Sequence, residues 1–197
     1  LYTDLEVSGV LKTRKYSEQQ LFAGVSGGTP TYKTDKREDN ENFIELGLQH
    51  NINAKTGFGL SYSLGGLNSN GNYLNWGPNQ SENKNTTVND ETIITNYRSY
   101  RSGRYGLNCF TGFIGGSNIY LLAYYGTTAY SGRLAKDGSD ALTAAKRLDK
   151  QTFFSVTWSK SIVSLKYSYE KNKSNDALYS YANNIASLNL KYLFRLN

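Results

Sequence analysis

The chain has 197 residues, with 22 Lys or Arg against 16 Asp or Glu and a formal net charge of +6. One cysteine and one histidine exclude an intramolecular disulfide and a cysteine-based zinc site, and two prolines with 17 tyrosines do not suit a disordered chain. No apolar run reaches 18 residues, which excludes a helical membrane span but leaves a membrane β-barrel open, because alternating strands average out to polar.

The first part of the chain predicts strands that become more regular along the sequence. Residues 4–14 and 20–32 suit a pleated, half-covered surface, whereas the polar stretch 33–41 predicts a loop. In residues 43–52, Ile44, Leu46, Leu48 and Ile52 fall on one face of a strand, and Glu45, Gly47, Gln49 and Asn51 fall on the other. A short polar link joins this run to a second alternating run at 58–64, so the two are expected to form a β-hairpin.

The middle of the chain has a weaker pattern. The Asn- and Gly-rich stretch 67–90 predicts a long surface loop. Three further strands are expected at 91–101, 104–114 and 118–130. Residues 135–150 have helical composition but no consistent apolar stripe, which predicts a loop with one helical turn at most.

Period-two alternation returns in the last quarter. It predicts a hairpin from 154–158 and 163–169 with a tight link at 159–161, then a loop at 171–181. The final strand, 182–196, has the cleanest alternation. No repeat or composition shift divides the chain, so residues 1–197 are expected to form a single all-β domain of about ten strands, with eight to twelve as the range.

Ten strands suit a soluble sandwich, a soluble barrel or a membrane barrel, and alternation alone does not separate them. Long strands, a very polar second face and aromatic residues near strand ends together favour a closed antiparallel transmembrane β-barrel. The residues expected to face lipid are Ile44, Leu46, Leu48, Phe58, Leu60, Leu165, Leu188, Leu190 and Phe194. Those expected to line the lumen are Lys12, Glu45, Gln49, Arg98, Lys166, Glu170, Lys191 and Arg195.

The stretch 167–194 (YSYEKNKSNDALYSYANNIASLNLKYLF) resembles the closing hairpin of Gram-negative outer-membrane β-barrels, including small porins and barrels associated with export. In those families the last strand alternates and ends on an aromatic residue that the assembly machinery recognises. Here Phe194 is followed by three further residues. The resemblance implies an outer-membrane location, with membrane lipid, lipopolysaccharide and the barrel-assembly machinery as partners. The chain begins at Leu1 without methionine, so we expect either a removed signal peptide or a piece of a longer polypeptide.

Few residues suggest chemistry. His50, the single histidine, shares a face with Ile44 and is expected to be a hydrogen-bonded residue at the membrane boundary, and Cys109 a small apolar residue. Paired carboxylates fall only in predicted loops, where solvated charge is the ordinary interpretation. We therefore expect no enzyme activity, no metal and no cofactor. Nucleic-acid binding is not expected either, because the tyrosines follow sheet parity instead of alternating with a basic stripe.

Three functions remain open at this point. A polar, partly cationic lumen favours a narrow channel or translocating barrel, with a preference for anions. The alternative is a closed barrel that presents its loops for adhesion or ligand binding. The third is a soluble β-barrel that binds a small apolar ligand. The sequence does not define the solute or the oligomeric state.

Overall fold

A computed structural model describes residues 4–26, 29–71, 73–75, 92–94, 97–113 and 115–191. The strands are β1 (Asp4–Ser26), β2 (Thr29–Asn53), β3 (Thr56–Ser69), β4 (Tyr73–Asn75), β5 (Thr92–Ile94), β6 (Tyr100–Gly112), β7 (Ser117–Lys136), β8 (Leu142–Lys160), β9 (Val163–Ser174) and β10 (Tyr181–Leu190), with a 3-10 helix η2 (Ala177–Tyr179) before the last strand. Within this part of the chain, no helix has the length and apolar character needed to cross a membrane.

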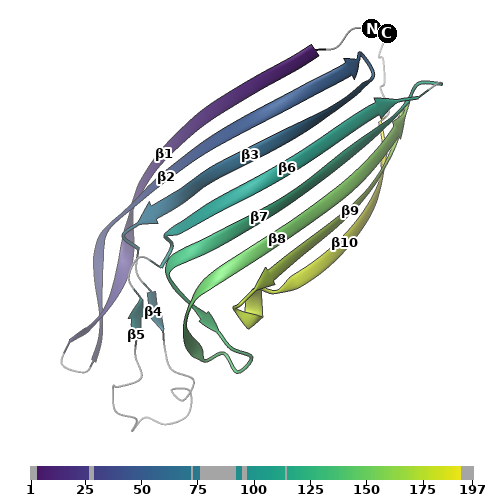
Figure 1. The fold of residues 1–197 in the computed structure, drawn as a ribbon. Helices are drawn as coiled ribbons and strands as arrows, with labels where there is room; N and C mark the ends of the chain where they lie inside the picture. Colours follow the sequence, from purple (N-terminus) through teal and green to yellow (C-terminus); the bar gives the residue numbers. More distant parts are fainter. Residues whose placement is uncertain are drawn as a thin grey trace, which may run out of the picture.

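The described residues form one antiparallel sheet of eight strands in the order β1-β2-β3-β6-β7-β8-β9-β10, and β4 pairs with β5 as a separate ribbon (Figure 1). Sheet order follows chain order. The all-β expectation is confirmed. The sheet is not closed, because neither edge strand, β1 nor β10, has a second partner among the described residues.

The two ends of the sheet differ in their connections. At the end where β1 begins and β10 finishes, two-residue links join β2 to β3 (Ala54–Lys55) and β8 to β9 (Ser161–Ile162), and four residues join β6 to β7. In that four-residue turn Gly115 and Gly116 have φ of +87° and +77°, a region that favours glycine. The opposite end, called here the long-hairpin end, carries η2, the β4–β5 ribbon and the far parts of β1 and β2.

The sheet is curled. One hollow of about 700 Å³ is lined by residues of β1, β2, β3, β6, β7 and β8. In a flat sheet β1 and β8 would lie five ladder steps apart, about 24 Å. The face that lines this hollow is called the inner face, and the opposite face the outer face.

Burial in this sheet is the reverse of that in a water-soluble domain. Among the described residues the only buried hydrophobic side chain is Ala135, whereas ten polar or charged residues are buried. Large aliphatic residues on the outer face are exposed, up to 75% for Val7. Water-soluble domains hide such residues in a core. The described sheet therefore has a polar inner face and an apolar outer face.

Several expected boundaries are wrong. Residues 15–19, between two expected strands, belong to β1, and the expected loops 67–90 and 171–181 include the ends of β3 and β9, the strand β4 and the helix η2. Residues 97–99, within an expected strand, lie in a turn.

Two longer stretches also differ. Residues 33–41, expected to be a loop, belong to β2 and pair along their length with β1. Residues 135–150, expected to be a loop with a helical turn, contain the end of β7, a five-residue turn and the first half of β8. Both stretches are rich in charged residues, and part of that charge is paired within the sheet: Arg37 with Glu18 across the ladder, and Arg147 with Asp149 on β8.

Candidate functional site

The inner face collects most of the residues expected to line a lumen. The cross-strand register places Lys12, Glu45, Gln49, Lys166 and Glu170 on this face. Glycine, serine and asparagine fill much of the remaining surface. A Cβ atom on Gly59 would lie 2.4 Å from Oε1 of Gln49, so a larger residue there would collide with its inner-face neighbours.

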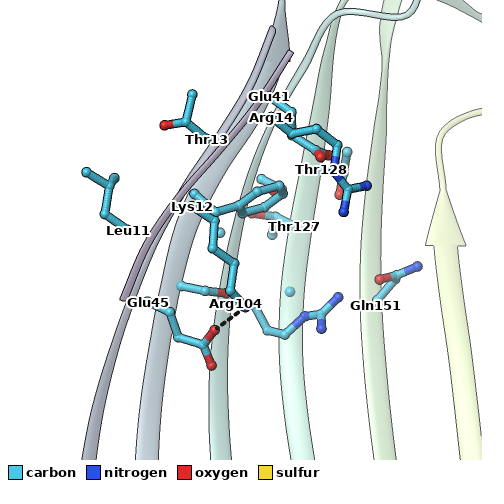
Figure 2. Close-up of a pocket in the computed structure, with 15 residues that line it drawn as sticks. Leu11, Lys12, Thr13, Arg14, Glu41, Glu45, Arg104, Thr127, Thr128 and Gln151 are labelled. Atoms are coloured by element: carbon cyan, nitrogen blue, oxygen red, sulfur yellow. Dashed lines mark ion pairs between the residues drawn. The ribbon is translucent and has the colours of Figure 1, made fainter. Parts of the chain in front are cut away.

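The hollow on the inner face is lined by charged and amide side chains (Figure 2). Lys12 Nζ lies 3.9 Å from Glu45 Oε2, the ion pair between these two predicted lumen residues. Arg14 and Arg104 line the same hollow, and the Arg104 guanidinium lies 4.5 Å from the centre of the Tyr124 ring. The arrangement offers cationic and hydrogen-bonding groups to a solute but no paired nucleophile and base.

Three predicted lumen residues are placed differently or lie outside the description. Arg98 is in the turn before β6, not on a strand face as expected, because the segment 97–99 leaves the sheet at the long-hairpin end. Lys191 directly follows β10 and is exposed, and its backbone N–H donates to the Ile162 carbonyl at 2.8 Å. Arg195 lies outside the described residues, as does Phe194, which was expected to face lipid.

The remaining residues expected to face lipid all lie on the outer face, between 37% and 68% exposed: Ile44, Leu46, Leu48, Phe58, Leu60, Leu165, Leu188 and Leu190. His50 also lies there, opposite Phe58, with the ring centres 5.4 Å apart in an edge-on arrangement. Cys109, on β6, is half-buried and lies opposite Phe58 in the β3–β6 ladder, on the same face.

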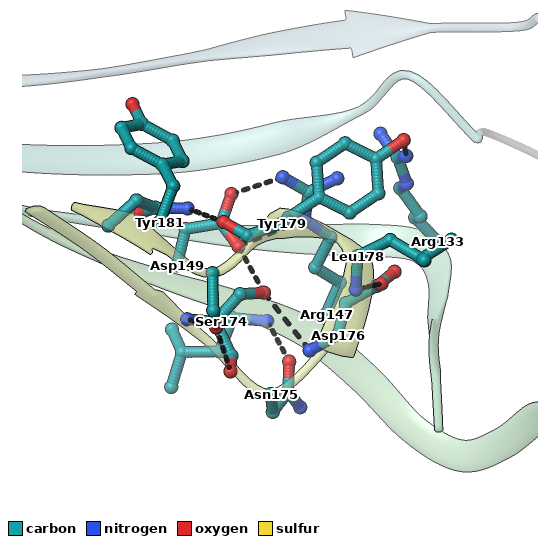
Figure 3. Close-up of polar contacts among 12 residues, drawn as sticks. Arg133, Arg147, Asp149, Ser174, Asn175, Asp176, Leu178, Tyr179 and Tyr181 are labelled. Carbon is teal, nitrogen blue, oxygen red and sulfur yellow. Dashed lines mark hydrogen bonds and ion pairs between the residues drawn. The ribbon is translucent and has the colours of Figure 1, made fainter. Parts of the chain in front are cut away.

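A buried ion pair between Arg147 and Asp149 lies on the inner face at the long-hairpin end (Figure 3). The Arg147 guanidinium donates to both carboxylate oxygens of Asp149, from Nε at 2.9 Å and from Nη2 at 2.6 Å. Its plane is covered by Tyr179, whose ring centre lies 3.4 Å away, and by Tyr130 at 4.8 Å. Arg133 lies over the same two rings and donates to the Tyr179 hydroxyl. This set of residues is called the Arg147 cluster.

The cluster is fastened to the β9–β10 connection. Ser174 donates to Asp149 at 2.6 Å, and the Asn175 amide both accepts from the Leu148 N–H and donates to the Lys146 carbonyl. Asp176, 1% exposed, caps η2 by accepting from the Leu178 N–H at 3.2 Å. These bonds hold the connection in one conformation against β8.

A second polar network links β1, β2 and β3 at the same end. Arg37 forms ion pairs with Glu18 at 2.6 Å and Asp39 at 3.2 Å. Ser69 donates to Asp39, and the Ser69 N–H donates to Ser99 Oγ at 2.9 Å. Both buried networks lie at the long-hairpin end and pair opposite charges that would be costly to bury alone.

Titration of the tyrosines at this end reflects their surroundings. Burial, together with a hydrogen bond to Glu41, raises the pKa of Tyr100 to about 12. Burial also raises the pKa of Tyr130 above its ordinary value. These phenols are therefore neutral at physiological pH. Across the described ranges, no group of three or more His, Cys, Asp or Glu residues is placed to hold a metal ion.

Sequence reasoning missed the Arg147 cluster because it falls in the stretch expected to be a loop. A signal was present: in a strand, Arg147, Asp149 and Gln151 fall on one face, and Leu148, Lys150 and Thr152 fall on the other, which would bring Arg147 and Asp149 side by side. Comparison of the chain with protein-family models, curated proteins and solved structures finds no match in any of the three.

Proposed function

We propose that this chain is an outer-membrane β-barrel whose outer face contacts lipid acyl chains. The observation that carries the proposal is the reversed burial, with aliphatic residues exposed on the outer face and polar residues buried inside. Membrane barrels have this arrangement, with short turns at one end and longer connections at the other. β10 has ten residues, within the length needed to cross the hydrocarbon layer.

In lipid, the free edges of β1 and β10 have to pair with each other. Each unpaired N–H or C=O in hydrocarbon costs several kcal/mol, so an open edge is not stable there. Both strands continue the apolar outer face to the edge, through Val7 and Leu11 on β1 and Leu188 and Leu190 on β10. Pairing would therefore give a continuous apolar exterior and an eight-stranded barrel.

The function best supported is that of a closed scaffold which presents a binding surface at its long-hairpin end. An eight-stranded barrel has an interior only wide enough for side chains to fill. Tyr124 and Phe153, stacked with ring centres 4.8 Å apart, and Arg104 occupy part of that interior. The two buried polar networks stabilise the long-hairpin end, which suits a surface that has to keep one shape for recognition.

The second candidate is a narrow passage for small anions. It is favoured by the hollow of about 700 Å³, in which Lys12, Arg14 and Arg104 outnumber the nearby Glu41 and Glu45. Basic side chains along a pore raise the local concentration of anions.

Orientation and conductance test the proposal together. The native cysteine is first removed by Cys109→Ala, and a single new cysteine is placed in the exposed β7–β8 turn by Gly138→Cys. This variant is expected to react in intact cells with a membrane-impermeant maleimide. The matched variant with Ile162→Cys, in the β8–β9 turn, is expected not to react. Equal labelling at both positions, or extraction of the protein without detergent, would contradict a membrane barrel. In planar bilayers the scaffold predicts no discrete channels, whereas anion-selective steps would favour the second candidate.

A further inference from the structure

Three lysines lie together on the outer face of β8 and β9 near the long-hairpin end. Lys150 is directly opposite Lys173 in the ladder, and Lys171 lies two residues further along the same strand as Lys173. All three are exposed. Residues opposite each other in an antiparallel pair have Cβ atoms about 5 Å apart, and diagonal neighbours about 7–8 Å. The three lysines therefore share one patch of the outer face, called here the lysine triad.

Among the residues that the structure describes, no carboxylate pairs with these lysines. The acidic residues adjacent in the chain, Asp149 and Glu170, point to the inner face, where Asp149 binds Arg147 and Glu170 accepts from the Tyr181 hydroxyl at 2.8 Å. The ladder partners of the triad on the outer face are neutral, among them Thr127, Thr152 and Ala182. Within the described chain no salt bridge reaches any of the three lysines. Like charges directly opposite one another destabilise a sheet, and an external anion relieves that repulsion.

An apolar groove lies on the same face, closer to the end of the sheet opposite the long-hairpin end. It has a volume of about 510 Å³ and is lined by residues of β8, β9 and β10, including Val156, Trp158, Leu165, Tyr167 and Leu188. Tyr167 is four residues from Lys171 on β9, which corresponds to about 13 Å along the strand. A cationic patch and an apolar groove thus lie on one face, and their separation of about 13 Å is within the reach of an extended acyl chain.

We propose that the lysine triad and this groove form a binding site for a membrane lipid with a phosphorylated, anionic headgroup. The phosphate is held by the three ammonium groups, and one acyl chain occupies the groove beside Trp158 and Leu188. The inference rests on the proposed function, because it requires the outer face to contact lipid. Exposed lysines alone would hold a free phosphate weakly, and the groove supplies the additional contact that selects a lipid.

Trp158 provides the readout. With Trp76, which lies outside the described residues, replaced by phenylalanine, Trp158 is the single tryptophan. The protein folded in zwitterionic detergent micelles is titrated with phosphatidic acid that carries brominated acyl chains, and the quenching of Trp158 fluorescence gives an apparent affinity. Brominated phosphatidylcholine is titrated in parallel as the lipid without net charge.

We expect phosphatidic acid to quench at lower concentration than phosphatidylcholine. A lysine near an anionic lipid surface contributes about fivefold in affinity, so the K150Q/K171Q/K173Q variant should bind phosphatidic acid about a hundredfold more weakly. The matched control is K160Q, on the outer face of β8 at the opposite end, which should leave the affinity unchanged. The difference in gel mobility between boiled and unboiled samples checks that each variant is folded.

The outcomes separate the two proposals. If both lipids quench equally and the triple variant behaves like the parent, the lysine triad is not a phosphate site, although lipid contact at the outer face stands. If neither brominated lipid quenches Trp158, the outer face is not lipid-facing and the membrane proposal fails as well. If inorganic phosphate displaces phosphatidic acid at equal concentration, the site recognises free phosphate and the lipid assignment is overturned.

Discussion

Breaking the buried Arg147–Asp149 pair by changing only one partner is expected to destabilise the folded protein severely. Arg147 and Asp149 are each 5% exposed. The Arg147→Met variant would leave the Asp149 carboxylate with Ser174 as its remaining hydrogen-bond donor. Removing one member of a buried ion pair costs about 3–5 kcal/mol, because the other charge stays buried without compensation. Loss of the stacking between the guanidinium and Tyr179 adds to this cost.

The double variant R147M/D149L gives the sharper test. It removes both charges and fills similar volume with apolar side chains, which is often neutral for stability. We therefore expect the double variant to be more stable than either single variant. The free energy of unfolding is measured by urea titration of protein folded in phosphatidylcholine vesicles, with tryptophan fluorescence as the signal. Single-variant losses below about 1 kcal/mol, or additive losses in the double variant, would show that the pair is not buried as described.

Three further predictions follow from other parts of the sheet. Leu60→Arg, on the outer face, should lower stability in lipid vesicles by about 2–4 kcal/mol; no change in urea midpoint would place that face in water. Gly66→Ala should destabilise by about 1–3 kcal/mol, because its Cβ would lie 2.4 Å from the Tyr100 carbonyl oxygen, whereas a Cβ on Gly103 would meet only ordinary van der Waals contacts at 4.0 Å, so Gly103→Ala serves as the control. Since the pKa of Tyr100 is raised from 10.0 to about 12, its contribution to stability is complete below pH 10 and is lost between pH 10 and 12. Absorbance titration of the phenolates should show this late step, and Tyr100→Phe should reduce its amplitude without removing it, because the pKa of Tyr181 is also raised to about 12.

Alternation predicted the parts of the fold in which one face is apolar. The hairpin of β2 and β3 and that of β8 and β9 were predicted because leucine, phenylalanine and tyrosine repeat with period two there. The same parity correctly grouped Ile44, Leu60 and Leu188 on one face. Which way that face points follows from burial, which sequence alternation does not encode.

The strands that the sequence analysis missed have charged inner-face residues, and residues on neighbouring strands supply the opposite charges and hydrogen-bond donors that stabilise them. Residues 33–41 are mostly charged and polar, and Arg37 is accommodated in β2 by Glu18 across the ladder on β1 and by Asp39 on its own strand. Likewise Asp149 is buried because Ser174, from β9, and Arg147 both donate to it. Such cross-strand compensation depends on register, and register is set by pairing between segments that the sequence does not identify.

Because the sheet follows chain order, each strand of the eight-stranded sheet pairs with the strand of that sheet that precedes or follows it along the chain. Most of the connections between these strands are short. Such ladders close small loops, and the entropic cost of each closure is low. In the proposed barrel, one ladder would differ: the pairing of β1 with β10 would unite the two extremities of the described chain. We therefore expect the hairpins to form rapidly one after another, and the pairing of β1 with β10, which closes the barrel, to limit the folding rate.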